Sequence, residues 1–158
     1  MMEELKRFEI EKTACVTGHR KIEKEFNVEN LADALILAIE KGITNFLIGM
    51  AVGFDMVCFK ILEKLKEIYP IKLIACIPCE DQPKKFSEYE KITYYKLINR
   101  ADEKVYVSKE YKKNCMNLRN FYMVDNSCLV IAYLKEEKGG TFNTVSYAKR
   151  KEKEIIYV

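Results

Sequence analysis

The chain has 158 residues, of which 49% are hydrophobic and 32% are charged, and this composition predicts one globular domain over residues 1–158. The net charge of +3 is too small to indicate a nucleic-acid-binding protein. The sequence has no apolar run near the roughly 18 residues of a membrane span, and residues 1–12 do not resemble a signal peptide.

Strand-like and helix-like segments alternate along the chain. In chain order, the expected elements are a strand at 13–17, a helix at 28–39, a strand at 44–48, a helix from about 55 to 69, a strand at 71–77, a helix at 88–99, a strand at 104–107, a helix at 114–125, a strand at 128–133, a helix at 141–150 and a strand at 154–158. Such βαβ units place helices on both faces of a sheet. The sequence therefore predicts an α/β fold of the Rossmann-like, doubly wound kind, with a mostly parallel sheet between two helical layers.

Local signals predict the ends and the inward faces of three helices. Asn27 is the expected N-cap of the first helix and Gly42 its end, and Pro70 is expected to end the second helix. In the third helix, Ile92 and Tyr95 are expected to point inward. The apolar stripe expected on the second helix consists of Val57, Ile61, Leu65 and Ile68.

Three glycine-containing turns follow predicted strands, at the edge where open α/β sheets bind ligands. Glycine lets the backbone approach a phosphate, and a helix N-terminus offers free N–H groups. We therefore expect the three turns to form one nucleotide-type site, with Thr141 as the N-cap of the last helix. The residues of the turns are Gly18, His19 and Arg20, then Gly49, Ala51, Gly53 and Asp55, and finally Gly139, Gly140 and Thr141.

The same turns also allow structural interpretations. His19, the only histidine, either hydrogen-bonds within a loop or contacts a ligand, and alone it cannot build a histidine-rich metal site. Gly49 and Gly53 permit either close helix–strand packing or ligand approach. Asp55 either favours the helix dipole or accepts hydrogen bonds from ribose hydroxyls. The turn at 139–141 is either a simple loop closing onto a helix or an anion nest.

Two further segments supply polar candidates. The irregular stretch 78–87 is expected to form a wall of the site, with Pro78 and Gln82 near the ligand. Gln82 suits a base edge or a sugar, although its spacing also fits an ordinary surface loop. Arg119, with Asn120 beside it, lies among apolar residues and is either a salt-bridged structural residue or an anion ligand.

The cysteines are expected to be buried thiols in a reducing compartment, because most of the six fall within apolar runs. Cys76 and Cys79 form a C-x-x-C motif. We expect no redox pair there, since Cys76 lies inside a strand and no helix begins at once. The chain also offers no second pair or further histidine to complete a zinc site.

In this order, the motifs resemble the YpsA-like family of the SLOG superfamily, which is named for DprA and the LOG phosphoribohydrolases. The likeness covers nearly the whole chain from about Thr13. It implies a Rossmann-like domain that binds a nucleotide-derived ligand, and a link to cell division in Gram-positive bacteria that suggests a sensor or adaptor. The segments that carry it are 16–20, 49–55, 77–79 with Gln82, 119–125, 131–132, and 139–141 with Tyr147 and Ala148.

The chain also differs from the LOG enzymes at a position that their catalysis requires. LOG enzymes cleave the N-glycosidic bond of nucleotide monophosphates with an arginine and a glutamate, in motifs that read approximately R-K-x-x-M and P-G-G-x-G-T-x-x-E. Arg119 and Met123 match the first motif, and Asn120 replaces its lysine. Thr144 stands where the second motif has its glutamate, and a neutral threonine cannot stabilise an oxocarbenium ion as a carboxylate does.

We therefore expect a cytoplasmic sensor that binds a nucleotide, requires no cofactor and holds no metal. The alternative is a nucleotide N-glycosidase that uses another carboxylate, with Asp55 and Arg119 as its candidate catalytic residues. DprA-like binding of single-stranded DNA is a weaker alternative, because the chain lacks a stripe of basic and aromatic residues. A protein partner and an oligomer remain open.

Overall fold

In the computed structural model, the residues described are 5–109 and 111–158. Within them, six strands form one sheet in the order β4-β3-β2-β1-β5-β6, and every neighbouring pair is parallel. The predicted doubly wound α/β fold is confirmed, with a sheet that is parallel throughout. The strands are β1 (Thr13–Gly18), β2 (Asn45–Ile48), β3 (Lys72–Ile77), β4 (Glu103–Tyr106), β5 (Leu129–Tyr133) and β6 (Glu154–Tyr157).

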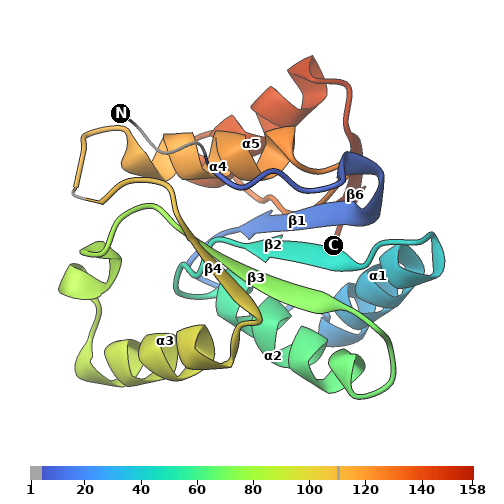
Figure 1. The fold of residues 1–158 in the computed structure, drawn as a ribbon, viewed down its shortest axis with the longest axis horizontal. Coiled ribbons are helices and arrows are strands. Elements are labelled where there is room, and N and C mark those ends of the chain that lie inside the picture. The colour runs from blue at the N-terminus through green and yellow to red at the C-terminus, as the bar shows by residue number, and fades with distance from the viewer. Residues whose placement is uncertain (1–4, 110) are drawn as a thin grey trace.

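In the same part of the chain, five α-helices connect the strands and cover both faces of the sheet. Figure 1 shows α4 and α5 on one face and α1, α2 and α3 on the other. A short 3-10 helix, Gln82–Lys85, interrupts the stretch that was expected to be irregular. None of the described helices is long and apolar enough to cross a membrane. The α-helices are α1 (Val28–Glu40), α2 (Phe54–Lys66), α3 (Glu88–Arg100), α4 (Cys115–Asp125) and α5 (Gly140–Arg150).

The order of the strands determines where a ligand can bind. The chain moves outward from β1 to β4 and then returns to place β5 on the other side of β1. Open α/β sheets bind ligands beyond the carboxyl ends of their strands, near such a reversal. The turns that follow β1, β2, β3 and β5 all lie at this edge, toward which the arrowheads of β1 and β2 point in Figure 1.

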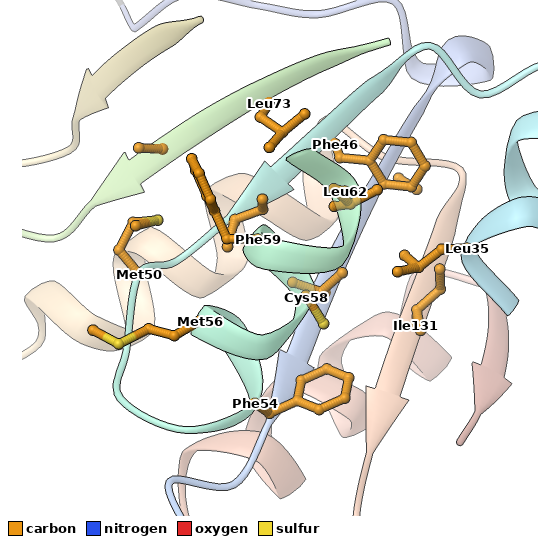
Figure 2. Packing of buried hydrophobic residues seen from close by; sticks show 14 of the residues in the cluster. Leu35, Phe46, Met50, Phe54, Met56, Cys58, Phe59, Leu62, Leu73 and Ile131 are labelled. Carbon is orange, nitrogen blue, oxygen red and sulfur yellow. The ribbon is translucent and has the colours of Figure 1, made fainter. Parts of the chain in front are cut away.

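Alternate side chains of the strands build two separate parts of the core. Phe46 and Ile48 belong to the cluster shared with α1, α2 and α3, whereas Leu47 between them packs with residues of α4 and α5. Figure 2 shows Phe59 of α2 packed among the strands, close to Leu73 of β3. Each such side chain, fully buried, contributes about 1.5–3 kcal/mol to folding. This packing holds the helices, and therefore the turns at the carboxyl edge, in fixed positions.

The predicted face of α3 was wrong. Ile92 and Tyr95 are 63% and 54% exposed, and the helix buries Tyr94, Leu97 and Ile98 instead. Apolar and aromatic residues lie on both sides of this helix, so periodicity alone did not distinguish its inner side from its outer side.

The predicted stripe of α2 lies at the margin of the core instead of its centre. Val57, Ile61 and Leu65 are half-buried, and Ile68 lies beyond the end of the helix and is exposed. The adjacent face of the helix forms the centre of the core, because its large aromatic side chains pack against the sheet. The fully buried residues on this face are Phe54, Cys58, Phe59 and Leu62.

The predicted helix ends are partly confirmed. The Asn27 side chain accepts hydrogen bonds from the backbone N–H groups of Glu29 and Asn30, as an N-cap does. Helix α1 stops two residues before Gly42, whose φ of +106° favours glycine. Helix α2 ends at Lys66, four residues before Pro70, although a hydrogen bond of 2.8 Å from the Tyr69 N–H to the carbonyl oxygen of Leu65 continues the turns up to the proline.

Candidate functional site

Polar side chains from three elements meet around the backbone of Gly49, directly after β2. Its carbonyl oxygen accepts a hydrogen bond from Arg119 Nη1 of α4 and another, of 3.1 Å, from Gln82 Nε2. A Cβ atom at Gly49 would lie 2.8 Å from Arg119 Nη1 and 3.1 Å from Asp55 Oδ2. A larger residue here would displace the ends of Arg119 and Asp55, so glycine lets both side chains reach the backbone. We call Gly49, Asp55, Gln82 and Arg119 the Gly49 cluster.

Arg119 is 4% exposed and ties α4 to the ends of two strands. Besides Gly49, its Nη1 donates to the carbonyl oxygen of Cys76 at 3.3 Å, and its Nε donates to Asn120 Oδ1 at 2.7 Å. Its Nη2 faces the sulfur of Met116 at 3.8 Å, and a thioether is a weak acceptor. Burial lowers the pKa of Arg119, and the nearby Asp55 opposes this effect. Arg119 thus has a structural role through two backbone carbonyl oxygens and not through the expected salt bridge, and the Nη2 arm retains donors for an anion.

The other two side chains of the cluster, Asp55 and Gln82, each carry a buried oxygen that accepts no hydrogen bond from the described residues. Asp55 and Gln82 are both 6% exposed, and among the residues that the structure describes, Asp55 Oδ1 and Gln82 Oε1 have no hydrogen-bond partner. Asp55 Oδ2 accepts the backbone N–H of Ala51 at 3.1 Å. A buried acceptor without a partner costs about 1–3 kcal/mol, so a ligand with hydroxyl or amino groups would relieve it here.

The environment of Asp55 also changes its acidity. Burial raises the pKa of its carboxyl from the ordinary value of 3.8 to about 6, although the charge of Arg119 and the Ala51 N–H lower it. Both protonation states are therefore populated close to neutral pH. Such a carboxyl is either a strong acceptor or a donor to a ligand, depending on pH.

The turn after β1 is held by packing and backbone hydrogen bonds. His19 Nε2 accepts the backbone N–H of Lys135 at 2.8 Å, and its ring packs edge-on against Tyr133. The histidine therefore links the loop after β1 to the loop after β5, where the strand order reverses. This contact agrees with the structural alternative, in which His19 hydrogen-bonds within a loop. Arg20 is exposed, and its guanidinium lies 6.0 Å from the centre of the Phe86 ring.

Two of the predicted ligand-binding glycines are closely packed against neighbouring residues. A Cβ atom at Gly18 would lie 2.4 Å from the ring of Phe54, and one at Gly53 would lie 2.1 Å from the carbonyl oxygen of Arg20. Gly53 also has a φ of +95°, a conformation that other residues rarely adopt. These contacts press the turn after β2 against the turn after β1.

Gly53→Ala is therefore expected to cost more stability than an alanine at another glycine of positive φ. The clash with backbone and the strained φ together should cost about 3 kcal/mol or more. Gly42→Ala is the matched control, because Gly42 has a φ of +106° with nothing within 4 Å of the added Cβ, and strain alone costs about 1–2 kcal/mol. Urea unfolding of both variants measures the difference, and equal losses would show that the contact with Arg20 does not matter.

The turn after β5 differs from the other two because its glycines leave open space. A Cβ atom at Gly139 or Gly140 would meet nothing within 4 Å, and both residues are exposed. The N-cap of α5 is Gly139, with φ +91° and ψ −173°, so the prediction that Thr141 caps the helix was wrong. The glycine-specific backbone starts the helix earlier than Thr141, which lies buried inside the first turn.

Two predicted residues form the surroundings of the cluster. Pro78 is buried, and its carbonyl oxygen accepts the N–H of Ser108 at 3.0 Å, which joins the loops after β3 and β4. Asn120 is half-buried and orients Arg119 through the hydrogen bond to Nε. The turn at 139–140 lies at the same edge of the sheet, on the other side of β1. Sequence reasoning did not identify Met116, since a methionine on a helix carries no specific signal.

Two cavities lie away from the Gly49 cluster. One of about 130 Å³ at the end of β5 is lined by Glu23 and Glu25, whose charges repel an anion. A groove of about 360 Å³ lies at the opposite edge of the sheet and has a basic lining, with Lys6, Arg7, Lys12 and Lys72 against Glu9 and Glu103. We favour the Gly49 cluster because it combines buried acceptors without donors with the carboxyl edge.

Comparison with known proteins places these features in a family. A family model named YpsA and described as the YspA SLOG family matches residues 14–157. YoqJ of Bacillus subtilis, an uncharacterised SPbeta prophage-derived protein, is 33% identical over 138 residues, which cover 76% of this chain and 81% of YoqJ. A UPF0398 protein of Listeria innocua is 25% identical, over 82% of this chain and 78% of that protein.

Two solved structures share the fold. DprA, a DNA processing protein, from Streptococcus pneumoniae has a TM-score of 0.66 at 15% identity, and the match covers 95% of this chain but 50% of DprA. DprA from Helicobacter pylori, described for its single-stranded DNA binding mode, has a TM-score of 0.67 at 16% identity, with coverages of 94% and 65%. This chain thus spans half to two thirds of those proteins. The match to residues 14–157 and the identity with YoqJ confirm the predicted relationship, and the chain belongs to the YpsA SLOG family.

Proposed function

We propose that this protein binds a nucleotide or a nucleotide derivative at the carboxyl edge of its sheet and acts as a sensor. The observation that carries the proposal is the Gly49 cluster. There, the Nη2 arm of Arg119 retains donors, and Asp55 Oδ1 and Gln82 Oε1 are buried acceptors without donors. A nucleotide offers acceptors on its phosphates and base and donors on its ribose and base, so it matches this mixed set.

The open turn at the start of α5 supplies a place for a phosphate. The N-terminus of a helix attracts anions through its dipole and its N–H groups. The side-chain space at Gly139 and Gly140 is empty, which lets a phosphate approach the backbone. The cluster and the turn lie on one edge of the sheet, separated by the end of β1, and a ligand with one anionic end and one donor-rich end would contact both.

The environment of Thr144 supports sensing over LOG-type hydrolysis. Thr144 is fully buried, and its hydroxyl donates to the carbonyl oxygen of Gly140 at 2.8 Å. A side chain held in this way offers neither a carboxylate nor a free hydroxyl to a sugar. The position where LOG enzymes carry their glutamate therefore supplies no acid or base.

One observation favours hydrolysis as the second candidate function. The raised pKa of Asp55, about 6, suits a general acid or base near neutral pH. Chromatography of AMP or CMP incubated with the wild type and with Asp55→Asn tests this reading. Turnover that disappears in the variant would replace the sensor proposal by a nucleotide N-glycosidase, and intact nucleotide supports sensing.

Alanine substitutions in the open turn test the phosphate contact. Ligand at about 100 times its dissociation constant should stabilise the wild type by roughly 2.7 kcal/mol in a thermal-shift screen of AMP, ADP and ADP-ribose. Gly140→Ala should leave the fold intact, because its Cβ has space, yet should reduce this stabilisation. Gly139→Ala should lose as much stability as Gly42→Ala through its positive φ, and of these two only Gly139→Ala should lose ligand response.

The control Gly42→Ala lies at the opposite edge of the sheet, after α1. An oligodeoxynucleotide in the same screen tests single-stranded DNA as the ligand. Stabilisation by the oligonucleotide alone would contradict the nucleotide proposal, as would an equal ligand response in Gly139→Ala, Gly140→Ala and the wild type.

A further inference from the structure

A non-local pair of thiols lies beside the Gly49 cluster. Cys115 Sγ and Cys79 Sγ are 3.8 Å apart, although 36 positions separate them in the sequence. Cys79 follows the end of β3, and Cys115 is the first residue of α4. Cys76, the other cysteine of the C-x-x-C motif, is fully buried within β3. The structure thus pairs Cys79 with a different cysteine from the one that the motif suggests.

The two thiols are covered, but their neighbours are at the surface. Cys79 and Cys115 are 1% and 0% exposed. Glu80 follows Cys79 directly and is exposed, and Asn114 and Met116 on either side of Cys115 are exposed as well. A disulfide has an S–S distance of about 2.05 Å, so the sulfurs need to approach by less than 2 Å. A loop on one side and a helix end on the other make such a small adjustment feasible.

We propose that Cys79 and Cys115 are an oxidative modification site, where hydrogen peroxide oxidises the two thiols to a reversible intramolecular disulfide. One thiol attacks the peroxide and becomes a sulfenic acid, while its proton and the departing hydroxide leave as water. The second thiol then displaces the sulfenic oxygen as a second water and forms the S–S bond. Two thiols are oxidised by two electrons, and one peroxide is reduced to two waters, so the steps balance.

The two covered thiols are expected to react slowly with peroxide. Burial raises the pKa of Cys79, which keeps its thiol protonated and slows its attack on oxidants. The resolving thiol already lies in contact, so a sulfenic acid would be captured before further oxidation. The disulfide would tie the loop that carries Gln82 to the helix that carries Arg119; any effect on ligand binding rests on the proposed function, but formation of the bond does not.

Peptide mapping tests the proposal without any nucleotide. Fully reduced protein is treated with hydrogen peroxide, alkylated after unfolding, digested and analysed without reductant. The expected result is a linked peptide that joins Cys79 to Cys115, an intact mass lower by two hydrogen atoms, and recovery of both thiols with dithiothreitol. Cys76→Ser should still form the bond, whereas Cys79→Ser and Cys115→Ser should not.

Three results would overturn the inference. They are complete alkylation of Cys79 and Cys115 after peroxide treatment, a linked peptide that joins Cys76 to Cys79, and oxidation of either thiol to a sulfonic acid without a link. Cys128→Ser controls for the half-buried cysteine at the distant start of β5, and this variant should form the Cys79–Cys115 bond at the wild-type rate.

Discussion

Asp55→Asn is expected to stabilise the protein at pH 7.5 and to weaken its binding of nucleotide. A pKa raised by burial from 3.8 to about 6 means that the ionised carboxyl opposes folding by an amount on the order of 3 kcal/mol. Asparagine keeps an oxygen that can accept the Ala51 N–H and carries no charge. The variant should therefore gain up to about 3 kcal/mol of stability at pH 7.5.

The pH dependence follows from the same pKa. Between pH 3.8 and about 6 the folded state binds more protons at Asp55 than the unfolded state does, so this group makes the wild type less stable as pH rises through that range. Above about pH 6 the loss is complete. The advantage of Asp55→Asn should therefore be full at pH 7.5 and should disappear below about pH 4.

Ligand binding should change in the opposite direction. A hydrogen bond to a charged group is worth about 1.5–3 kcal/mol, so loss of the carboxylate should weaken nucleotide binding roughly 10- to 100-fold at pH 7.5. Urea unfolding from pH 4 to 8 and titration calorimetry measure the two effects. Asp33→Asn, on the exposed side of α1, is the control and should change neither. A less stable Asp55→Asn at pH 7.5 would contradict this account of the buried carboxyl.

Arg119→Ala is expected to lower both stability and binding. The variant removes hydrogen bonds to the carbonyl oxygens of Gly49 and Cys76, which join α4 to the ends of β2 and β3. It also removes the positive charge that lowers the pKa of Asp55, so that pKa should rise further. The Asp55 carboxylate would then be buried without its nearby cation, which costs about 3–5 kcal/mol.

A double-mutant cycle separates the charge from the hydrogen bonds. In the Asp55→Asn background no carboxylate depends on Arg119, so Arg119→Ala should cost less there than in the wild type. Arg119→Lys retains the charge without the planar fork and should fold better than Arg119→Ala while binding nucleotide weakly. Arg100→Ala is the matched control, because that exposed arginine contacts Glu63 at 3.5 Å and should change stability by less than about 1 kcal/mol. Equal costs of Arg119→Ala in both backgrounds would show that the two side chains are not coupled.

The sequence predicted the order of elements, and it indicated the carboxyl edge as the candidate site, because both inferences depend on local patterns. Alternating apolar runs, the Asn27 cap and the glycines after strands are visible without knowledge of neighbours. The function of each glycine was not visible, because it depends on contacts across the sheet. Gly53 packs against Arg20, whereas Gly139 faces open space, and both read as glycine in a turn.

The partners of Arg119 and Cys79 could not be predicted for a related reason. Arg119 of α4 binds the backbone carbonyl oxygens of Gly49, directly after β2, and of Cys76 in β3, and such a contact leaves no trace in the sequence. Cys115 meets Cys79 only because α4 begins beside the end of β3. The prediction of the inward face of α3 was wrong for a different reason, because apolar side chains lie on both sides of this helix.

An amide NMR titration with ADP-ribose tests most directly whether the carboxyl edge is the nucleotide site. The account predicts that the largest shifts occur at the N–H groups of Gly49, Ala51 and Gly140, with little change at Thr44 and Lys72, which line the groove at the opposite edge. Saturable shifts at the first set would place the ligand across the Gly49 cluster and the open turn. Shifts centred on Thr44 and Lys72, or none at millimolar nucleotide, would contradict the central claim.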